Sequence, residues 1–410
     1  MRLSASQRQV LERLLFGGHA VEAVIGVAGS GKTTIMAATR SAWESRGLVV
    51  AGAATAAVAA AGLSAESGIA SATIAGWLQR IGSGPGLAGI DVLVVDEGAI
   101  VDDRQLAALL AEAGRTRTKV VLIGDPLQLK AVGVGGTFAA IHRQLGGATL
   151  TENRRQRDQM ERAALALWRD GEREQALRTW NQAGRVVAGR GADDTMAKML
   201  ADWAAARARY HGDPHAELAG LALMARRNAD VDQLNAAARA VRRAAGELSG
   251  PDVLYPRADG SRLPLAVGDH VRIRVNDYRA RRGEASADVL NGMRGTVAAI
   301  DTSRRVLVEW RNPAHPDGPR LERQWLEPDY IAAGGLSHGT AMTIAATQGA
   351  TVDYALVYGH GLDPHSLYAA MSRDRHSVRL YLPRELLETD ADRARHGAPD
   401  SYEVELQRAL

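Results

Sequence analysis

The sequence predicts an α/β protein whose first part is a doubly wound parallel sheet. Over the first 150 residues, segments of helical composition alternate with four short apolar runs, at 23–25, 48–51, 92–95 and 120–123. This alternation is typical of parallel strands joined by crossover helices. In such a sheet, ligands bind beyond the carboxyl ends of the strands, so the residues that follow each run are the candidates for function.

A second structural class is predicted further along the chain. Three segments, 271–275, 295–300 and 306–310, alternate apolar and polar residues and are separated by turn signals such as Asn291-Gly292. Short alternating runs with turns between them indicate an antiparallel sheet. We therefore expect a small antiparallel β-barrel within the second half of the chain.

Composition limits the classes of function. The 410 residues are 46% apolar, which is enough for two or three domains with cores. The formal net charge is only +3, so any nucleic-acid binding must come from local basic patches. The absence of cysteine excludes disulfides, thiol catalysis and Cys-ligated metal. There is no signal peptide and no apolar run of about 18 residues, so we expect a cytoplasmic protein without a membrane partner.

Residues 26–33 read GVAGSGKT and lie between an apolar run and a segment of helical composition. Glycines allow successive backbone N–H groups to surround a triphosphate, and the helix that follows adds its positive end. Lys32 is expected to reach the β- and γ-phosphates, and Thr33 to ligate Mg²⁺. A glycine-rich connection with a stray lysine is the alternative, but it would not match both flanks. The predicted phosphate loop and helix start are formed by Gly26, Ala28, Gly29, Ser30, Gly31, Lys32, Thr33 and Thr34.

Polar residues follow two further predicted strands. Asp96 and Glu97 end the run 92–95, and Gln128 follows the run 120–123. Beside a phosphate loop, Asp96 is expected to hold Mg²⁺, and Glu97 to orient or deprotonate an attacking water. Gln128 lies where it can sense the γ-phosphate. The alternatives are a solvated acidic turn and a loop glutamine without a role.

Gln7 has two interpretations. It is the fourth residue of a Ser-x-x-Gln sequence that begins at Ser4, which is typical of a capping box at a helix start. As a side-chain amide upstream of the phosphate loop, it is also a candidate to contact an adenine base. The residues alone leave both open.

The order of the motifs resembles that of superfamily-one DNA helicases. The motifs are the loop 26–33, the strand end Asp96-Glu97, the segment GDPLQL at 124–129 and the segment ENRRQ at 152–156. The chain is similar to the RecD-like branch, and more narrowly to the helicase part of conjugative (MobF-type) relaxase-helicases. The resemblance covers nearly the whole chain.

The resemblance implies two RecA-like P-loop NTPase domains. The first would cover 1–155, with a reduced 1B insert at 64–91, and the second would cover 156–260 and 336–410. An SH3-like β-barrel would be inserted in the second domain at 261–335. The cofactors implied are ATP and Mg²⁺.

The resemblance also implies roles for individual residues. Gln7 would read adenine, Arg155 would be the first arginine finger, and Arg373 the second finger, delivered from the other domain. Arg154 is adjacent to Arg155, and the sequence does not separate the two. The residues implied to contact DNA are Thr55, Thr73, Thr343, Thr347 and Gln348.

The function implied is a monomeric, ATP- and Mg²⁺-dependent motor on single-stranded DNA that acts as a 5′–3′ helicase. The interval 78–91 is short and glycine-rich where the family often inserts a strand-separating hairpin. The alternatives are therefore an ATP-switched translocase or DNA-binding module without unwinding, and an unrelated P-loop NTPase. A relaxase or another DNA-processing protein is the expected partner. A role in conjugation and a role in repair both stay open. Because no nicking residues precede the motor, the sequence also leaves open whether the chain is a fragment of a longer protein.

Overall fold

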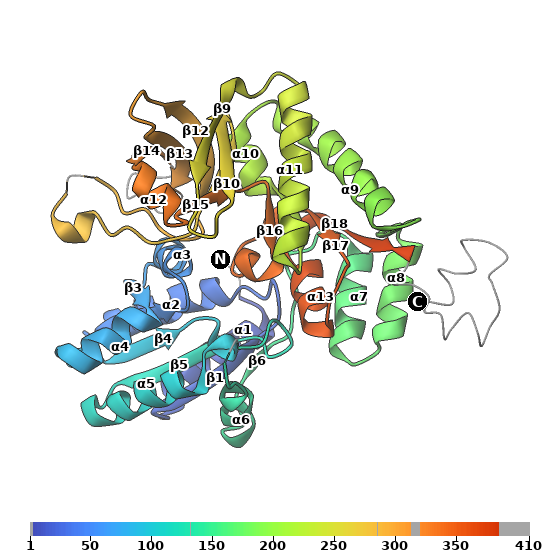
Figure 1. The fold of residues 1–410 in the computed structure, drawn as a ribbon. Helices are drawn as coiled ribbons and strands as arrows, with labels where there is room; N and C mark the ends of the chain where they lie inside the picture. Colours follow the sequence, from blue (N-terminus) through green and yellow to red (C-terminus); the bar gives the residue numbers. More distant parts are fainter. Residues whose placement is uncertain (1–2, 132, 285, 313–319, 385–410) are drawn as a thin grey trace. The chain divides into compact units, whose positions relative to one another are not determined.

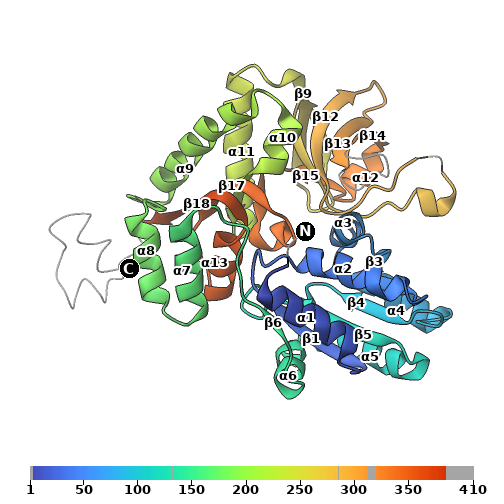
Figure 2. The same ribbon diagram turned by 180° about the vertical axis from the view of Figure 1, so that it is seen from behind.

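The structure, a computed structural model, describes residues 3–131, 133–284, 286–312 and 320–384 (Figures 1 and 2). The chain forms two compact units, and each contains a parallel sheet. Unit 1 comprises Met1–Arg155, Val275–Met293 and Arg311–Glu322. Unit 2 comprises Gln156–Arg274, Arg294–Trp310 and Arg323–Leu410.

The sheet of unit 1 has six parallel strands in the order β3-β2-β4-β5-β1-β6. Its central strands are apolar and buried, apart from the half-buried Lys119 at the start of β5, because helices cover both faces. The order confirms the doubly wound parallel sheet that the apolar runs predict. The strands are β1 (Val21–Gly26), β2 (Val50–Ala54), β3 (Ser71–Thr73), β4 (Val92–Val95), β5 (Lys119–Gly124) and β6 (Thr149–Leu150).

Two apolar clusters hold the helices of unit 1 to this sheet. On one face, α1 (Ala5–Phe16) and α2 (Lys32–Glu44) pack through Leu14 and Trp43. On the other face, three helices pack through residues such as Trp77, Leu109 and Phe138. These helices are α4 (Ile74–Ser83), α5 (Asp103–Thr116) and α6 (Thr137–Gln144), while α3 (Ala57–Ser67) connects β2 to β3.

The structure describes every residue of the short interval between Thr73 and Asp96. It holds α4, a turn at 84–91 and then β4. No β-hairpin is present in this interval. These residues therefore do not form a strand-separating hairpin.

The sheet of unit 2 has five parallel strands in the order β16-β8-β17-β18-β7. Helices α9 (Ala192–Arg207) and α11 (Asn228–Ala244) pack on it through Trp203 and Leu234. The strands are β7 (Val186–Gly189), β8 (Leu221–Ala225), β16 (Ala341–Thr343), β17 (Val352–Tyr358) and β18 (Asp374–Pro383). The remaining helices are α7 (Gln159–Arg169), α8 (Arg173–Gln182), α10 (Pro214–Gly220), α12 (Pro328–Ala332) and α13 (Pro364–Met371).

A second sheet, which we call the insert sheet, interrupts unit 2. Its order is β14-β13-β12-β11-β15, with β11 antiparallel to both β12 and β15. The structure therefore has the antiparallel insert that the sequence predicts, whereas its SH3-like character stays a prediction. Strand β15 still belongs to this sheet, so the parallel sheet resumes at β16. The strands are β11 (His270–Ile273), β12 (Arg294–Ile300), β13 (Val306–Asn312), β14 (Arg320–Leu326) and β15 (Leu336–His338), beside a hairpin of β9 (Ser249–Pro256) and β10 (Arg262–Val267).

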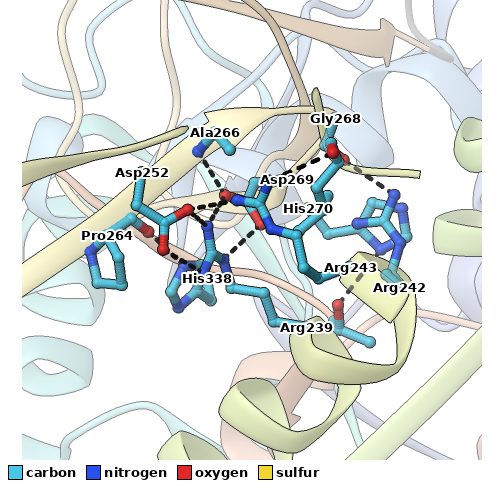
Figure 3. Close-up of polar contacts among 12 residues, drawn as sticks. Arg239, Arg242, Arg243, Asp252, Pro264, Ala266, Gly268, Asp269, His270 and His338 are labelled. Carbon is cyan, nitrogen blue, oxygen red and sulfur yellow. Dashed lines mark hydrogen bonds and ion pairs between the residues drawn. The ribbon is translucent and has the colours of Figure 1, made fainter. Parts of the chain in front are cut away.

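An ion-pair network joins helix α11 to the insert (Figure 3). The guanidinium of Arg239 donates to Asp269 Oδ1 at 2.8 Å and to Asp252 Oδ2 at 3.0 Å. Asp269 is only 1% exposed, and its second oxygen also accepts from the N–H of Ala266 at 2.7 Å. Two carboxylates from different parts of the insert therefore meet one cation of the helix.

We predict that Arg239→Met lowers the free energy of unfolding by about 3–5 kcal/mol, because it leaves the buried Asp269 carboxylate without its cation. Arg243→Met is the matched control. Arg243 lies on the same helix and pairs with Asp252, but its side chain is 35% exposed, so we expect a loss of at most about 1 kcal/mol. Urea unfolding of both variants measures the difference. Equal losses would show that the Arg239 pair does not hold the insert.

Candidate functional site

The phosphate loop lies where the sequence predicts it, between β1 and α2. Gly26 is the last residue of β1, and Lys32 is the first residue of α2. Gly29 and Gly31 have φ angles of +74° and +79°, in the left-handed region that favours glycine. The loop therefore turns sharply into the N-terminus of a 13-residue helix, whose first N–H groups have no partner within the helix.

Lys32 folds over the loop. Its Nζ donates to the carbonyl of Gly26 at 3.2 Å, and a Cβ on Gly26 would lie 2.5 Å from Cγ and Cδ of Lys32. Only glycine therefore leaves room for this lysine. Ser30 is 1% exposed, and within the described part of the chain its Oγ has no hydrogen-bond partner. A buried hydroxyl in a glycine loop with a lysine fits a phosphate group.

The segment that carries the two adjacent arginines packs directly on the loop. The N–H of Arg154 donates to the carbonyl of Gly29 at 2.9 Å. A Cβ on Gly29 would lie 2.4 Å from Cβ of Arg155 and 2.6 Å from Oδ1 of Asn153. That Oδ1 accepts from the N–H of Arg155 at 3.0 Å, which fixes the turn. Asn153 is thus a positioning residue to which the sequence analysis assigned no role, although Asn before a turn is a usable signal.

The two arginines differ in their surroundings. The guanidinium of Arg154 pairs with Glu152 at 2.9 Å, and both side chains are more than 40% exposed. Arg155 is half-buried against the loop. Arg154 touches Gly29 through its backbone N–H, whereas Arg155 approaches it with its side chain.

The two acidic residues end β4 at the same edge of the sheet. The N–H of Glu97 donates to Asp96 Oδ1 at 2.9 Å, and Glu97 itself has a φ of +50°. Burial and the neighbouring Glu97 raise the pKa of Asp96 to about 6, against the opposing effect of the Lys32 cation. The charges of Lys32 and Asp96 therefore act on one another, as a shared phosphate and metal site requires.

Gln128 lies on the segment that follows β5, the strand that pairs with β4. Gly124, the last residue of β5, is close enough to the loop after Glu97 that a Cβ would lie 2.7 Å from the N–H of Ala99. Gln128 is 2% exposed, and its N–H donates to the carbonyl of Asp125 at 3.1 Å. The parallel sheet thus brings together the phosphate loop, the acidic pair and the segment of Gln128.

A magnesium site here would use few protein ligands. Thr33 in the first turn of α2 and Asp96 at the end of β4 are the oxygen donors at this edge. In the described residues, no group of three or more His, Asp or Glu side chains has a metal-binding arrangement. One or two protein oxygens together with substrate phosphates are what Mg²⁺ commonly accepts, so these donors fit that ion.

Gln7 serves the helix cap and the loop together. Its Oε1 accepts from the N–H of Ser4 at 3.1 Å, and its own N–H donates to Ser4 Oγ at 3.2 Å. The capping box is therefore confirmed. Its Nε2 donates to the carbonyl of Ser30 at 3.1 Å, in a buried contact with the phosphate loop. Recognition of adenine by Gln7 stays a prediction.

Two threonines predicted to contact DNA lie at neighbouring strand ends in unit 1. Thr55 directly follows β2 and is exposed, while Thr73 ends β3 and pairs in register with Ala54. The Thr73 hydroxyl accepts from the N–H of Gly76 at 3.0 Å and so caps α4. Both hydroxyls thus lie at the carboxyl edge of the sheet.

The corresponding segment of unit 2 follows β16. Thr343 is half-buried and caps the next turn by accepting from the N–H of Ala346 at 3.2 Å. Thr347 is 1% exposed, and its hydroxyl donates to the carbonyl of Ile344 at 2.7 Å. Gln348 is half-buried. In this geometry Thr347 supports the turn, and its contact with DNA stays a prediction.

Arg373 follows α13 in unit 2 and is 2% exposed. Its neighbour Asp374 is fully buried, and Gln156 Nε2 donates to the carbonyl of Asp374 at 2.9 Å. Glu161 shares this environment, and burial followed by the Asp374 charge raises the pKa of Glu161 to about 9. The sequence analysis assigned no role to Gln156, Glu161 or Asp374. The role of Arg373 as a second finger stays a prediction.

Comparisons with known proteins agree with this geometry. A family model described as an AAA domain matches residues 2–191. The conjugal transfer protein TraA of Agrobacterium fabrum is 35% identical over 383 residues, which are 93% of this chain and 32% of the relative. The TraA of Rhizobium radiobacter is 34% identical with the same coverage. The chain thus spans about a third of these relatives. A shorter match, 44% over 62 residues, covers 15% of this chain and 11% of the RecBCD enzyme subunit RecD of Mycolicibacterium smegmatis.

Solved structures share the fold. The Pif1 helicase of Candida albicans has a TM-score of 0.61 at 19% identity, with 93% of this chain and 95% of that chain covered. Pif1 from Bacteroides, solved with ADP-AlF3 and single-stranded DNA, has a TM-score of 0.57 at 18% identity, with 93% and 92% covered. Among the described helices, none combines the length and apolar character needed to cross a membrane. In sequence the chain is similar to the TraA conjugal transfer proteins and, over a short stretch, to RecD, and it shares its fold with the Pif1 helicases.

Proposed function

We propose that the chain is an ATP-dependent motor on single-stranded DNA that hydrolyses ATP with Mg²⁺ and acts as a 5′–3′ DNA helicase. The observation that carries the proposal is the set of groups at the carboxyl edge of the unit 1 sheet. There, a glycine loop with Lys32, the acidic pair after β4 and the arginine segment packed on Gly29 meet at one place. This is the combination that in-line phosphoryl transfer to water requires.

Each group has a part in the proposed chemistry. The loop N–H groups and Lys32 bind the β- and γ-phosphates, and Glu97 orients the attacking water. Thr33 and Asp96 hold Mg²⁺, which neutralises charge on the phosphate oxygens when bound. Gln128 senses the γ-phosphate. Arg155 meets the charge that develops on the transferred group, and Arg373 of the second RecA-like domain adds to it.

The DNA contacts and biological setting are part of the same proposal. The residues that contact the strand are Thr55, Thr73, Thr343, Thr347 and Gln348, and the hydroxyl of Thr347 also supports the turn that carries it. We propose an SH3-like insert, a monomeric and cytoplasmic motor, and a relaxase or another DNA-processing protein as partner. The likeness to the TraA proteins favours conjugation over repair.

A second candidate is an ATP-switched translocase that does not unwind duplex DNA. The observation that favours it is the interval 74–91, which holds α4 and a turn and has no hairpin. A strand can be moved without such an element, whereas separation of two strands needs a wedge.

We predict that single-stranded DNA stimulates ATP hydrolysis, because family members couple the two. Hydrolysis is measured with and without an oligonucleotide. A forked duplex with a 5′ tail then separates the two candidates, since only a helicase releases the complementary strand. Strong hydrolysis that DNA does not change would contradict any translocase and favour an unrelated P-loop NTPase.

We predict that Lys32→Ala abolishes turnover and that Arg155→Ala lowers it about 10³-fold with ATP still bound. The matched control is Arg154→Ala, which removes the exposed neighbour that pairs with Glu152. We expect this control to turn over ATP at close to the unmodified rate. Steady-state turnover and nucleotide binding are measured for all three variants. A loss in Arg154→Ala as large as that in Arg155→Ala would refute the assignment of the finger.

We predict that Gln7→Ala weakens ATP affinity about tenfold, because the phosphate loop loses a buried hydrogen bond to Ser30. Ser4→Ala is the control. It costs about 1 kcal/mol of stability by removing the cap but keeps the contact with the loop. Binding of a fluorescent ATP analogue and the thermal midpoint are measured in parallel. If both variants weaken binding alike, Gln7 acts through the cap alone.

A further inference from the structure

Two carboxylic acids of unit 2, which we call the carboxyl pair, lie in contact inside the protein. Glu161 in the first turn of α7 and Asp374, the first residue of β18, are both 0% exposed. Their side chains are hydrogen-bonded to one another, and such a bond needs a proton on one of the two carboxyls. Two ionised carboxylates in contact would repel each other in a site that water does not reach. The geometry therefore favours one proton on the pair.

One guanidinium group is shared by two carboxyls of this cluster. Arg185, which directly precedes β7, places its Nε 2.9 Å from Glu161 Oε1. Its Nη2 donates to Oδ2 of Asp158, the residue that caps α7, at 2.7 Å. Burial and the Asp374 charge raise the pKa of Glu161 from 4.5 to about 9, against the opposing effect of Arg185. The shared cation thus does not restore an ordinary acidity to Glu161.

Two further cations on the packed elements make contacts of their own. On α7, Nη1 of Arg162 donates to the carbonyl of Gln156 at 2.8 Å. On β18, Nη1 of Arg375 lies 3.1 Å from Oδ1 of Asp353. Both guanidinium groups thus have partners outside the carboxyl pair.

The carboxyl pair holds the chain directly after Arg373, the residue predicted to be the second arginine finger. Gln156 Nε2 donates to the carbonyl and to Oδ1 of Asp374, at 2.9 and 3.2 Å. Glu161 Oε1 accepts from the N–H of Val378, further along β18, at 3.2 Å. Side chains that precede and begin α7 thus hold the start of β18 at two points. The position of Arg373, which is 2% exposed, depends on the strand that follows it.

We propose that the carboxyl pair shares one proton at neutral pH, and that this proton makes Glu161 a positioning residue for Arg373. The second half of the proposal rests on the proposed function, in which Arg373 acts on the transferred phosphoryl group. Release of the proton to solvent would leave two adjacent negative charges in a buried site. The start of β18 would then move away from α7 and displace Arg373. ATP hydrolysis would therefore depend on the protonation of a group that does not touch the nucleotide.

The pH dependence of folding tests the shared proton without any activity. Glu161 binds its proton more tightly in the folded than in the unfolded chain, so its contribution to stability is complete below about pH 4.5 and is lost as the pH rises towards 9. Between about pH 6 and 8, this should raise the unfolding equilibrium constant about tenfold per pH unit. Glu161→Gln and Asp374→Asn keep a hydrogen bond between the two side chains without a shared proton. Each should remove this dependence.

Asp158→Asn is the matched control. Burial opposes ionisation of Asp158, but hydrogen bonds from Arg185 and from the N–H of Met160 lower its pKa. Its carboxyl is therefore ionised in the folded and the unfolded chain above about pH 6, and asparagine also caps a helix. The control should keep the pH dependence of the unmodified protein. Urea unfolding at several pH values measures all four proteins, and an unchanged dependence in Glu161→Gln and Asp374→Asn would refute the shared proton.

ATP turnover tests the positioning of Arg373. With a pKa of about 9, about three quarters of the carboxyl pair has lost its proton at about pH 9.5. Between about pH 7 and 9.5, the turnover of the unmodified protein should therefore fall about fourfold relative to that of Glu161→Gln. The ratio of the two rates removes effects of pH that both proteins share. Nucleotide affinity should stay equal in the two proteins, because an arginine finger acts on the transition state.

Two results would overturn the role of Glu161 in positioning Arg373. One is a turnover that depends on pH alike in the unmodified protein and in Glu161→Gln. The other is a loss of turnover that an equal loss of nucleotide binding accompanies. If the unmodified protein hydrolyses no ATP, the proposed function fails and the positioning role with it, whereas the unfolding measurements still decide whether the carboxyl pair shares a proton.

Discussion

The close approach of the arginine segment to the phosphate loop is the contact on which the candidate site depends. It exists because Gly29 has no side chain, since a Cβ there would lie 2.4 Å from Cβ of Arg155. The same glycine has a φ of +74° and accepts the N–H of Arg154 through its carbonyl. A side chain at this position would strain the loop and push the segment away. The conformation of the phosphate loop and the position of the arginine segment therefore both depend on Gly29.

The chain leaves unit 1 immediately after this contact. Arg155 is the last residue of the first segment of unit 1, and Gln156 begins unit 2. Gln156 is 1% exposed, and its amide donates to the carbonyl and to Oδ1 of Asp374, at 2.9 and 3.2 Å. Asp374 in turn follows Arg373. One peptide bond thus joins a residue of unit 1 that packs on the phosphate loop to a residue of unit 2 that is hydrogen-bonded to Asp374.

Much of unit 1 follows from local sequence, because parallel strands end at a common edge. That rule alone brings Lys32, Asp96 and Gln128 to the same side of the sheet, and the structure agrees. Strands β3 and β6 have only three and two residues, too few for a periodic pattern. The contact of Asn153 with Gly29 arises from tertiary packing.

The insert also changes how the two units are linked. After the step from Arg155 to Gln156, the chain passes between the units at Arg274–Val275 and back at Met293–Arg294, and it crosses twice more around 311–322. Within unit 1, Gly292 has a φ of +103°, and a Cβ there would lie 2.6 Å from Cγ1 of Val58 on α3. A segment rooted in β11 and β12 of the insert thus packs beside the strand end that carries Thr55. The chain therefore passes between the two units five times, and four of these passages lie within the insert.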